Sequence, residues 1–201
     1  MPRTAIIFDF GGVLMKTQSR APRLAWDDQL GLSHGTVERV VHSSESWHLA
    51  QIGRVSVADY WADVAAQLQI ESAQIPQLEA DYFSADQLDG SLISLINDLR
   101  AENHPVALLS NDSPALLDKL THLNIAHLFD PLVISGDIGF MKPDPTAYLT
   151  ILDRLSLSAD QTVFIDDMPA NITGAQAVGM HAIHYQDGMD LRGALAPYLT
   201  P

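Results

Sequence analysis

Residues 4–14 read Thr4-Ala5-Ile6-Ile7-Phe8-Asp9-Phe10-Gly11-Gly12-Val13-Leu14. The apolar run before Asp9 contains β-branched residues, and a short run of this kind with polar and glycine residues at its end is typical of a buried strand. Asp9 would then stand at the carboxyl end of the strand. Glycines such as Gly11 and Gly12 let the backbone approach a ligand closely. The segment therefore predicts a buried strand with a carboxylate and a close-approach loop at its end.

Similar apolar runs recur along the chain and predict further strands. They cover residues 105–109, 131–134, 162–165 and, with weaker apolar character, 181–184. Between these runs, leucine, isoleucine and tyrosine recur at helical spacing over residues 92–99, 116–123 and 148–155. Strands that alternate with helices form a parallel sheet covered on both faces. The expected fold class is α/β, with a three-layer Rossmann-like core.

One long stretch departs from this alternation. Between about Met15 and Leu88 the sequence shows no clear strand, and its pattern predicts helices over 23–30, 35–45, 57–69 and 75–83. An insertion after the first strand is placed to cover the carboxyl edge of the sheet. We therefore expect a core domain of residues 1–14 and 89–201, and a helical cap of residues 15–88.

The composition excludes several functional classes. The chain of 201 residues has 25 acidic and 11 basic residues, and its formal charge of −14 would repel nucleic-acid phosphates and anionic membranes. It has no cysteine, which excludes disulfides, thiolate metal sites and cysteine nucleophiles. The apolar runs are too short for a membrane helix, and the run before Asp9 is too short for a signal peptide. We expect a cytoplasmic protein without nucleic-acid or membrane partners; the sequence does not indicate an oligomeric state.

Polar side chains that could support catalysis stand at the ends of the expected strands, where open parallel sheets bind ligands. These residues are Asp9, Ser110, Asn111, Asp166 and Asp167, with Lys142 in the loop after the third strand. Three carboxylates in one crevice repel each other unless one is protonated or a cation holds them. Oxygen ligands suit Mg²⁺, while a lysine and a serine hydroxyl suit a phosphate group. The set predicts a magnesium and phosphate site.

Each of these residues has a plainer interpretation when taken alone. Asp9 could be an ordinary turn residue after a strand. Asp166 and Asp167 could cap the helix expected near Pro169, and Lys142 could be a solvated loop lysine. Their order along the chain and their shared position at strand ends favour a joint site.

Four motifs in this order resemble the haloacid dehalogenase-like (HAD) superfamily, in the subgroup whose helical cap follows the first strand. They are residues 7–14, residues 109–111, residues 139–145 and residues 164–172. The resemblance spans essentially the whole chain and is closest to bacterial sugar-phosphate phosphatases and the phosphatase domain of epoxide hydrolase-like proteins. The motifs are specific for the superfamily and much less specific for the substrate.

The resemblance implies a Mg²⁺-dependent phosphatase that acts through an aspartyl-phosphate on a small metabolite, with a sugar phosphate favoured. Asp9 would attack phosphorus, and Lys142 would neutralise Asp9 and the transferring group. Mg²⁺ would be held by one Asp9 oxygen, the Gly11 carbonyl and Asp167. Asp166 would hold a metal-bound water or contact the ion directly.

The resemblance also implies where the substrate binds. Ser110 and the backbone of Asn111 would bind phosphate oxygens. In the cap, Gly53 would form a turn whose tip faces the active site, so that His48 and Arg54 could contact the remainder of the substrate. A surface loop without contact to the substrate is the alternative for this segment.

One position departs from the pattern of the resemblance. Most phosphatases of the superfamily carry an acid–base aspartate two residues after the nucleophile, and this chain has Gly11 there. The loss of a general acid typically costs about 10²- to 10⁴-fold in rate. Three explanations stay open: a leaving group that needs little protonation, such as a sugar 1-phosphate; a proton from water or another residue, such as His48; or weak activity.

Two alternative functions are compared with a phosphatase. Gly11 favours a non-catalytic or regulatory domain that binds a phosphorylated ligand. The intact Asp9 and Lys142 oppose that alternative, because a binding domain needs no in-line nucleophile. Dehalogenases of the superfamily typically show an aromatic residue, Gly and Thr after the nucleophile and need no metal, so the paired aspartates Asp166 and Asp167 argue against dehalogenation.

Overall fold

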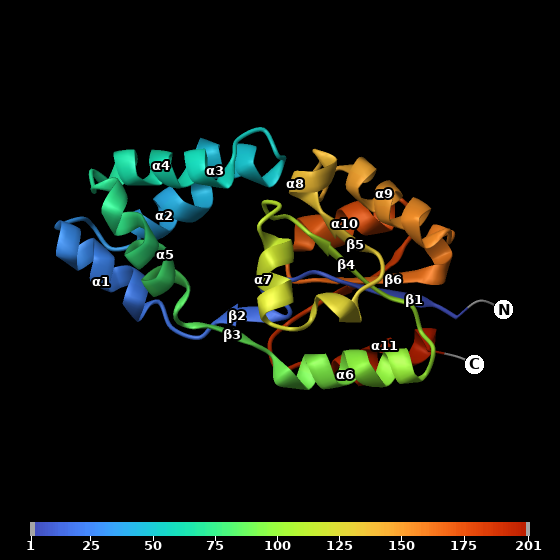
Figure 1. The fold of residues 1–201 in the computed structure, drawn as a ribbon. Helices are drawn as coiled ribbons and strands as arrows, with labels where there is room; N and C mark the ends of the chain where they lie inside the picture. Colours follow the sequence, from blue (N-terminus) through green and yellow to red (C-terminus); the bar gives the residue numbers. More distant parts are fainter. Residues whose placement is uncertain (1–2, 200–201) are drawn as a thin grey trace.

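The computed structural model describes residues 3–199 (Figure 1). Its centre is a parallel sheet in the order β5-β4-β1-β6-β7. The strands are β1 (Ala5–Phe8), β4 (Val106–Ser110), β5 (Leu132–Ile134), β6 (Thr162–Asp166) and β7 (His181–His184). Each overlaps a run that the sequence predicts as a strand.

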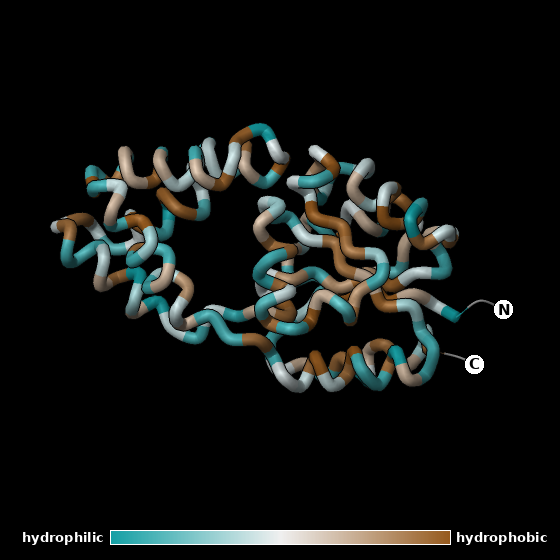
Figure 2. Tube along the Cα trace, in the orientation of Figure 1, coloured by the Kyte–Doolittle hydropathy of each residue, from teal (hydrophilic) through white to brown (hydrophobic). Residues whose placement is uncertain are grey.

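Helices cover both faces of this sheet. The side chains of β1 alternate between the faces, as in any strand: Ile6 and Phe8 pack with one apolar cluster and Ile7 with another. The first cluster includes residues of α6 (Gly90–Ala101), α7 (Leu116–His122) and α11 (Leu191–Leu195), and the second includes residues of α9 (Pro145–Leu155) and α10 (Pro169–Ala177). The central strands are correspondingly apolar over most of their length (Figure 2), whereas the edge strand β7 begins and ends with an exposed histidine. The predicted three-layer α/β core is confirmed.

A second group of helices lies beyond the carboxyl edge of the sheet (Figure 1). It consists of α1 (Ala21–Leu30), α2 (Thr36–Ser43), α3 (Glu45–Gln51), α4 (Val57–Leu68) and α5 (Ile75–Phe83). These helices share an apolar cluster of their own, in which Trp26, Tyr60, Trp61 and Tyr82 are buried. We call this group the cap helices.

The structure differs from the sequence-based expectation in three places. The expected helix over residues 35–45 ends at Ser43, because the Ser44 side chain accepts a hydrogen bond from the Trp47 N–H and so begins the separate helix α3. The stretch expected to lack strands contains two short ones, β2 (Met15–Thr17) and β3 (Asp86–Leu88). These strands pair antiparallel and form the two-stranded connection between the sheet and the cap helices.

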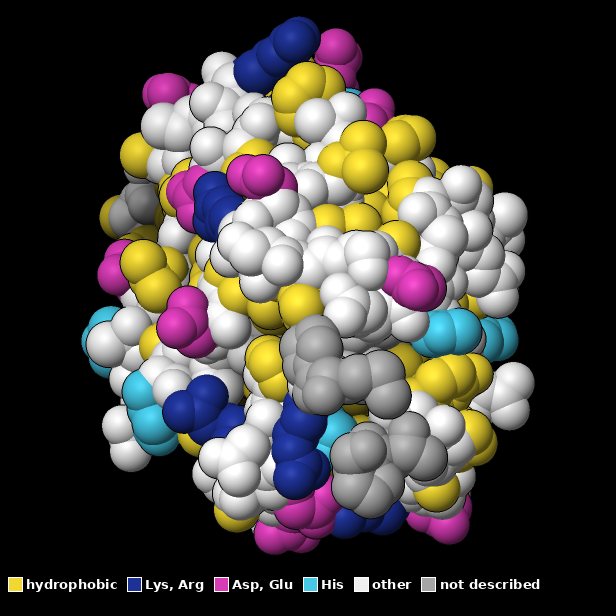
Figure 3. Space-filling view, turned by 90° about the vertical axis from the view of Figure 1, so that its right-hand side faces the viewer, with side chains coloured by type: hydrophobic (Ala, Val, Ile, Leu, Met, Phe, Trp, Pro, Cys, Tyr) yellow, Lys and Arg dark blue, Asp and Glu magenta, His cyan; other side chains and the backbone are white. Residues whose placement is uncertain are grey.

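Short elements complete the chain. They are α8 (Ser135–Ile138) and the 3₁₀ turns η1 (Ser72–Gln74), η2 (Ala126–Leu128), η3 (Ala159–Gln161) and η4 (Ala196–Tyr198). Over residues 3–199, no helix combines the length and the apolar character required to cross a membrane. On the end of the core away from the cap helices, acidic and basic side chains are interspersed (Figure 3).

Candidate active site

The carboxyl ends of β1, β4 and β6 bring the predicted polar residues together. Phe8 pairs with Leu108 of β4 and Ile165 of β6, so the residues that follow these positions are neighbours across the sheet. Asp9 directly follows β1, while Ser110 and Asp166 end β4 and β6. Residues widely separated in sequence therefore meet at one edge.

Lys142 joins two of the carboxylates. Its Nζ lies 2.8 Å from Asp9 Oδ1 and 2.7 Å from Asp166 Oδ2, and it also donates to the Leu109 carbonyl at 2.9 Å. The Asn111 side chain fixes the Lys142 backbone through two hydrogen bonds of 2.8 Å: its Oδ1 accepts from the Lys142 N–H, and its Nδ2 donates to the Lys142 carbonyl. Lys142 is therefore a buried cation in a fixed position beside Asp9, and not a solvated loop lysine.

Asp9, Asp166 and Asp167 form the cluster expected for a metal. One oxygen of each lies within 4.8 Å of the others. Both oxygens of the Asp166 carboxylate are bonded within the protein. Asn171 Nδ2 lies 3.0 Å from each of them, Lys142 Nζ donates to Oδ2, and the Met168 N–H donates to Oδ1 at 2.8 Å. Asp9 and Asp167 both line the adjacent cleft. Oxygen donors alone suit a hard cation, so the cluster fits Mg²⁺.

The electrostatics of the cluster support the same interpretation. Burial raises the pKa of Asp9 to about 7, against the lowering effect of Lys142 and with a further rise from Asp166. Burial and the charge of Asp166 also raise the pKa of Asp167. A bound divalent cation would reverse this penalty and favour the ionised carboxylates. The arrangement therefore holds more negative charge than one lysine neutralises.

Two neighbouring cavities with three lining residues in common lie beside these residues. The first, of about 520 Å³, is lined by Asp9, Gly11, Gly12, Ser110, Asn111, Lys142 and Asp167, among others; we call it the phosphate cleft. The second, of about 290 Å³, lies between the cap helices and α7 and is lined by Val57, Tyr60, Trp61, Phe83, Leu116 and Lys119, among others; we call it the aromatic cavity. His42, Trp47 and Asp112 line both. A ligand with a phosphate and an apolar part could occupy the two together.

The cap helices touch the core at the tip of α3. Gln51 Nε2 donates to the Asn111 carbonyl at 2.9 Å. Gly53, with φ +67°, lies so close to Gly136 that an added Cβ would be 2.3 Å from the Gly136 carbonyl oxygen. The tip of the Gly53 turn therefore does meet the core at the active-site edge.

The predicted substrate-binding residues of the cap lie elsewhere. Within residues 3–199, His48 and Arg54 are exposed and line neither cavity. Their predicted contact with the substrate stays a prediction. The cap side chains that do line the phosphate cleft are His42, Trp47 and Gln51.

Sequence reasoning missed three residues at the site. Asn171 accompanies Asp166, and its signal is its place one turn into the helix after the paired aspartates. Asp112 directly follows Asn111, and the sequence Ser110 to Pro114 around it also fits an ordinary helix start. His42 stands on α2, far away in sequence, and carries no motif that could identify it.

The sequence of this chain matches a known protein family. A family model described as haloacid dehalogenase-like hydrolase matches residues 4–179. The chain belongs to this family. The superfamily resemblance seen in the motifs is confirmed, and the chain is a hydrolase by family.

Curated relatives of this HAD-like hydrolase cover nearly its full length. It is 28% identical over 187 residues to the sesquiterpene phosphatase astK of Aspergillus oryzae, which covers 92% of this chain and 91% of the relative. It is 26% identical to the fructose-1-phosphate phosphatase YqaB of Escherichia coli, over 89% of this chain and 94% of the relative.

The fold is also shared with solved structures of HAD enzymes. A HAD family enzyme of Bacteroides thetaiotaomicron, solved with magnesium and inorganic phosphate, superposes with a TM-score of 0.80 at 20% identity. The match covers 96% of this chain and 98% of that one. At this identity the likeness concerns the fold.

Proposed function

We propose that this HAD-like hydrolase is a Mg²⁺-dependent phosphatase that hydrolyses a small phosphomonoester through an aspartyl-phosphate. The observation that carries the proposal is Asp9, which lines the phosphate cleft with its carboxylate 2.8 Å from the buried Lys142 ammonium. A carboxylate so placed can attack phosphorus, and the fixed ammonium can stabilise the charge that develops in the transition state.

The other residues of the cleft take supporting roles in this proposal. Ser110 and the backbone of Asn111 would bind phosphate oxygens. Asp9, the Gly11 carbonyl and Asp167 would hold Mg²⁺. Asp166, which is bonded to Lys142, Met168 and Asn171, would hold Lys142 in position beside Asp9. When bound, Mg²⁺ would neutralise charge on the phosphate group. The relatives named as phosphatases and the magnesium in the Bacteroides enzyme support this assignment.

The substrate in this proposal is a phosphorylated metabolite. A sugar phosphate is favoured by the motif resemblance and by the name of the Escherichia coli relative, and the aromatic cavity would accept the organic part. We also propose a cytoplasmic location and no nucleic-acid or membrane partners; the charge of −14 supports the second part, because it would repel phosphate backbones and anionic membranes.

The experiment that tests the proposal is phosphate release from a panel of sugar phosphates, nucleotides and flavin mononucleotide, with Mg²⁺ and with EDTA. We expect Mg²⁺-dependent turnover that falls by roughly 10³-fold or more in Asp9→Asn, because removal of a nucleophile typically costs several powers of ten. The folded state of the variant would be checked by its melting temperature. If the wild type released no more phosphate than Asp9→Asn from any substrate, the alternative would be supported, namely a domain that binds a phosphorylated ligand.

A further inference from the structure

The junction of the two cavities is where the scissile bond would lie. A phosphomonoester with its phosphate beside Asp9 and its organic part in the aromatic cavity must pass its bridging oxygen between them. His42, Trp47 and Asp112 line both cavities. Trp47 has no proton to transfer at neutral pH, because its indole N–H is only a hydrogen-bond donor. Asp112 and His42 are therefore the two titratable side chains at the junction.

His42 is poorly suited to donate a proton there. Its Nδ1 lies 2.8 Å from the Tyr82 hydroxyl, and its ring packs against Trp47, Tyr82 and Phe83. Desolvation by these neighbouring rings, with a smaller contribution from the Arg23 charge, lowers the pKa of His42. At neutral pH the ring is therefore the neutral imidazole, which is a very weak acid.

Asp112 is held in place by its own backbone. Its N–H donates to Ser135 Oγ at 3.0 Å, and its carbonyl accepts from the Gly136 N–H at 3.0 Å. Its Oδ1 accepts from the Ser113 N–H at 2.7 Å, which fixes one edge of the carboxyl. The residue also follows Asn111, whose carbonyl is bonded by Gln51 of the cap helices. The Asp112 backbone is therefore bonded to α8, and the Ser113 N–H fixes one oxygen of the carboxyl just beyond the end of β4.

The surroundings of Asp112 favour its protonated form. Burial raises its pKa to about 6, although Ser113 and the charge of Lys119 act in the opposite direction. The titratable and charged groups that line the same two cavities with Asp112 are His42, Tyr60, Glu79 and Lys119 in the aromatic cavity, and Asp9, Lys142 and Asp167 in the phosphate cleft. An aspartic acid with this pKa carries its proton in a substantial fraction of molecules near pH 6 and can release it during the reaction.

We propose that Asp112 is the acid that protonates the leaving oxygen, in the role that Gly11 cannot fill. This inference rests on the proposed phosphatase function. As the bond between Asp9 and phosphorus forms, the bond from phosphorus to the substrate oxygen breaks. Its electron pair stays on that oxygen, which takes the Asp112 proton. In the second step, the Asp112 carboxylate takes a proton from the water that hydrolyses the aspartyl-phosphate, and this restores the acid.

The test compares leaving groups of different basicity in Asp112→Asn, an isosteric variant that cannot donate a carboxyl proton. Alcohol release is measured in a single turnover, so that only the first step is observed. With a sugar or alkyl phosphate we expect a fall of about 10²- to 10⁴-fold. With p-nitrophenyl phosphate, whose phenolate leaves without a proton, we expect a change of less than about threefold. Asp112→Glu should recover part of the loss.

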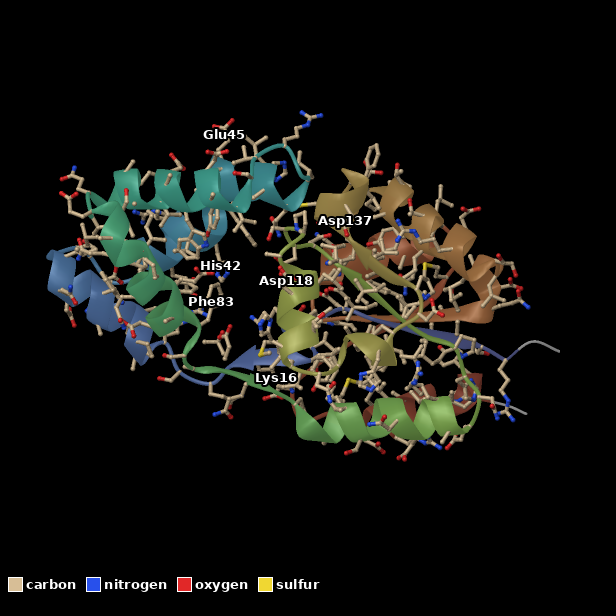
Figure 4. All side chains as sticks on the ribbon, in the orientation of Figure 1. Lys16, His42, Glu45, Phe83, Asp118 and Asp137 are labelled. Atoms are coloured by element: carbon tan, nitrogen blue, oxygen red, sulfur yellow. The ribbon has the colours of Figure 1, made fainter. Side chains whose placement is uncertain are left out.

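The pH dependence supplies an independent readout. The wild-type rate of alcohol release from an alkyl phosphate should fall as the pH rises through about 6, because the acid must be protonated, and this limb should be absent in Asp112→Asn. Asp118→Asn is the matched control, since Asp118 is an exposed carboxylate of the same region on α7 (Figure 4). It should match the wild type with both substrates.

The possible failures are distinguishable. No turnover by the wild type on any substrate would defeat the proposed function itself. Wild-type turnover with an equal loss on both leaving groups in Asp112→Asn, or with no loss, would overturn the role of Asp112. A selective loss on alkyl phosphates in His42→Gln, but not in Asp112→Asn, would assign the acid to His42 and also overturn the inference.

Discussion

Two adjacent glycines after the nucleophile differ sharply in what surrounds them. Gly12 has φ +76°, and a Cβ there would lie 2.3 Å from Asp167 Oδ2. At Gly11 a Cβ would meet nothing within 4 Å, and the backbone is not in the left-handed region. In the proposed metal site Gly11 would supply only its carbonyl, while the absence of a Cβ at Gly12 makes room for the Asp167 carboxylate.

We therefore predict that Gly12→Ala impairs the metal site and that Gly11→Ala does not. The Cβ of Gly12→Ala must displace the Asp167 carboxylate, and a loss of about tenfold or more in Mg²⁺ affinity is expected. The measurement is the rise in melting temperature with increasing Mg²⁺, since binding to the native state stabilises it. Equal responses to Mg²⁺ in the two variants would contradict the assigned role of Asp167.

Some neighbours in the candidate site could be predicted from the sequence and others could not. Asp9, Lys142 and Asp166 could be predicted as neighbours, because parallel strands end at a common edge and these residues stand at or near strand ends. Asp112 and His42 could not. Their proximity depends on how the cap helices dock against the core, and neither periodicity nor a motif records that docking.

At the scale of elements, the connection between the sheet and the cap helices is the antiparallel pair of β2 and β3, which ion pairs anchor to the core. Lys16 of β2 lies 2.8 Å from Asp89 and 2.6 Å from Asp187, and its Nζ also donates to the Tyr185 hydroxyl at 2.6 Å. Asp89 in turn begins α6, because its carboxylate accepts from the Ser91 N–H at 3.0 Å and the Leu92 N–H at 3.2 Å. One aspartate therefore serves both as a helix cap and as the anchor of the connection.

We predict that Asp89→Ala lowers the free energy of unfolding by about 1–2 kcal/mol, the usual cost of a lost N-cap. Asp98→Ala, an exposed aspartate later in α6, should change it by less than about 0.5 kcal/mol. Urea denaturation measures both. If Asp98→Ala lowered the free energy of unfolding as much as Asp89→Ala, the Asp89 N-cap of α6 would make no specific contribution to stability.

The same variant has a defined pH dependence. Hydrogen bonds from Lys16, Ser91 and Leu92 outweigh desolvation and lower the pKa of Asp89 to about 2. A depressed pKa in the folded state stabilises the protein above the unfolded value near 4 and loses that effect as the pH falls toward 2. The difference between the wild type and Asp89→Ala should therefore shrink between pH 4 and pH 2.

The elements themselves were unequally predictable. The buried strands of the sheet can be recognised in the sequence as continuous apolar runs, because both of their faces are covered. The strands β2 and β3 have only three residues each, with a burial pattern that gives no alternation to detect. The break between α2 and α3 depends on one hydrogen bond from the Trp47 N–H to Ser44. Short elements set by single contacts leave little trace in hydrophobic periodicity.

At the scale of the whole molecule, two contacts between the cap helices and the core lie well apart. One is the antiparallel pair of β2 and β3, where the Arg23 guanidinium binds Glu38 at 2.9 Å and Asp86 at 3.2 Å and so ties α1 to β3. The other is the tip of α3 against Asn111 and α8. The two cavities lie between these contacts, and His42 and Phe83 are on the side of the cap helices that faces α7 (Figure 4). The contact at α3 therefore lies at the edge of the phosphate cleft, where Gln51 and Asn111 both line it.

We predict that Gly53→Ala impairs this contact. Its Cβ would lie 2.3 Å from the Gly136 carbonyl oxygen, so the tip of α3 must withdraw from the core, and exclusion of water from the phosphate cleft would suffer. Gly31→Ala is a matched control, because Gly31 has the same φ of +67° with nothing within 4 Å. Both variants should lose about 1–2 kcal/mol of stability from left-handed strain. Only Gly53→Ala should lower kcat/KM, by about tenfold or more, and an equal effect of the two on kcat/KM would mean that the α3 contact does not control the site.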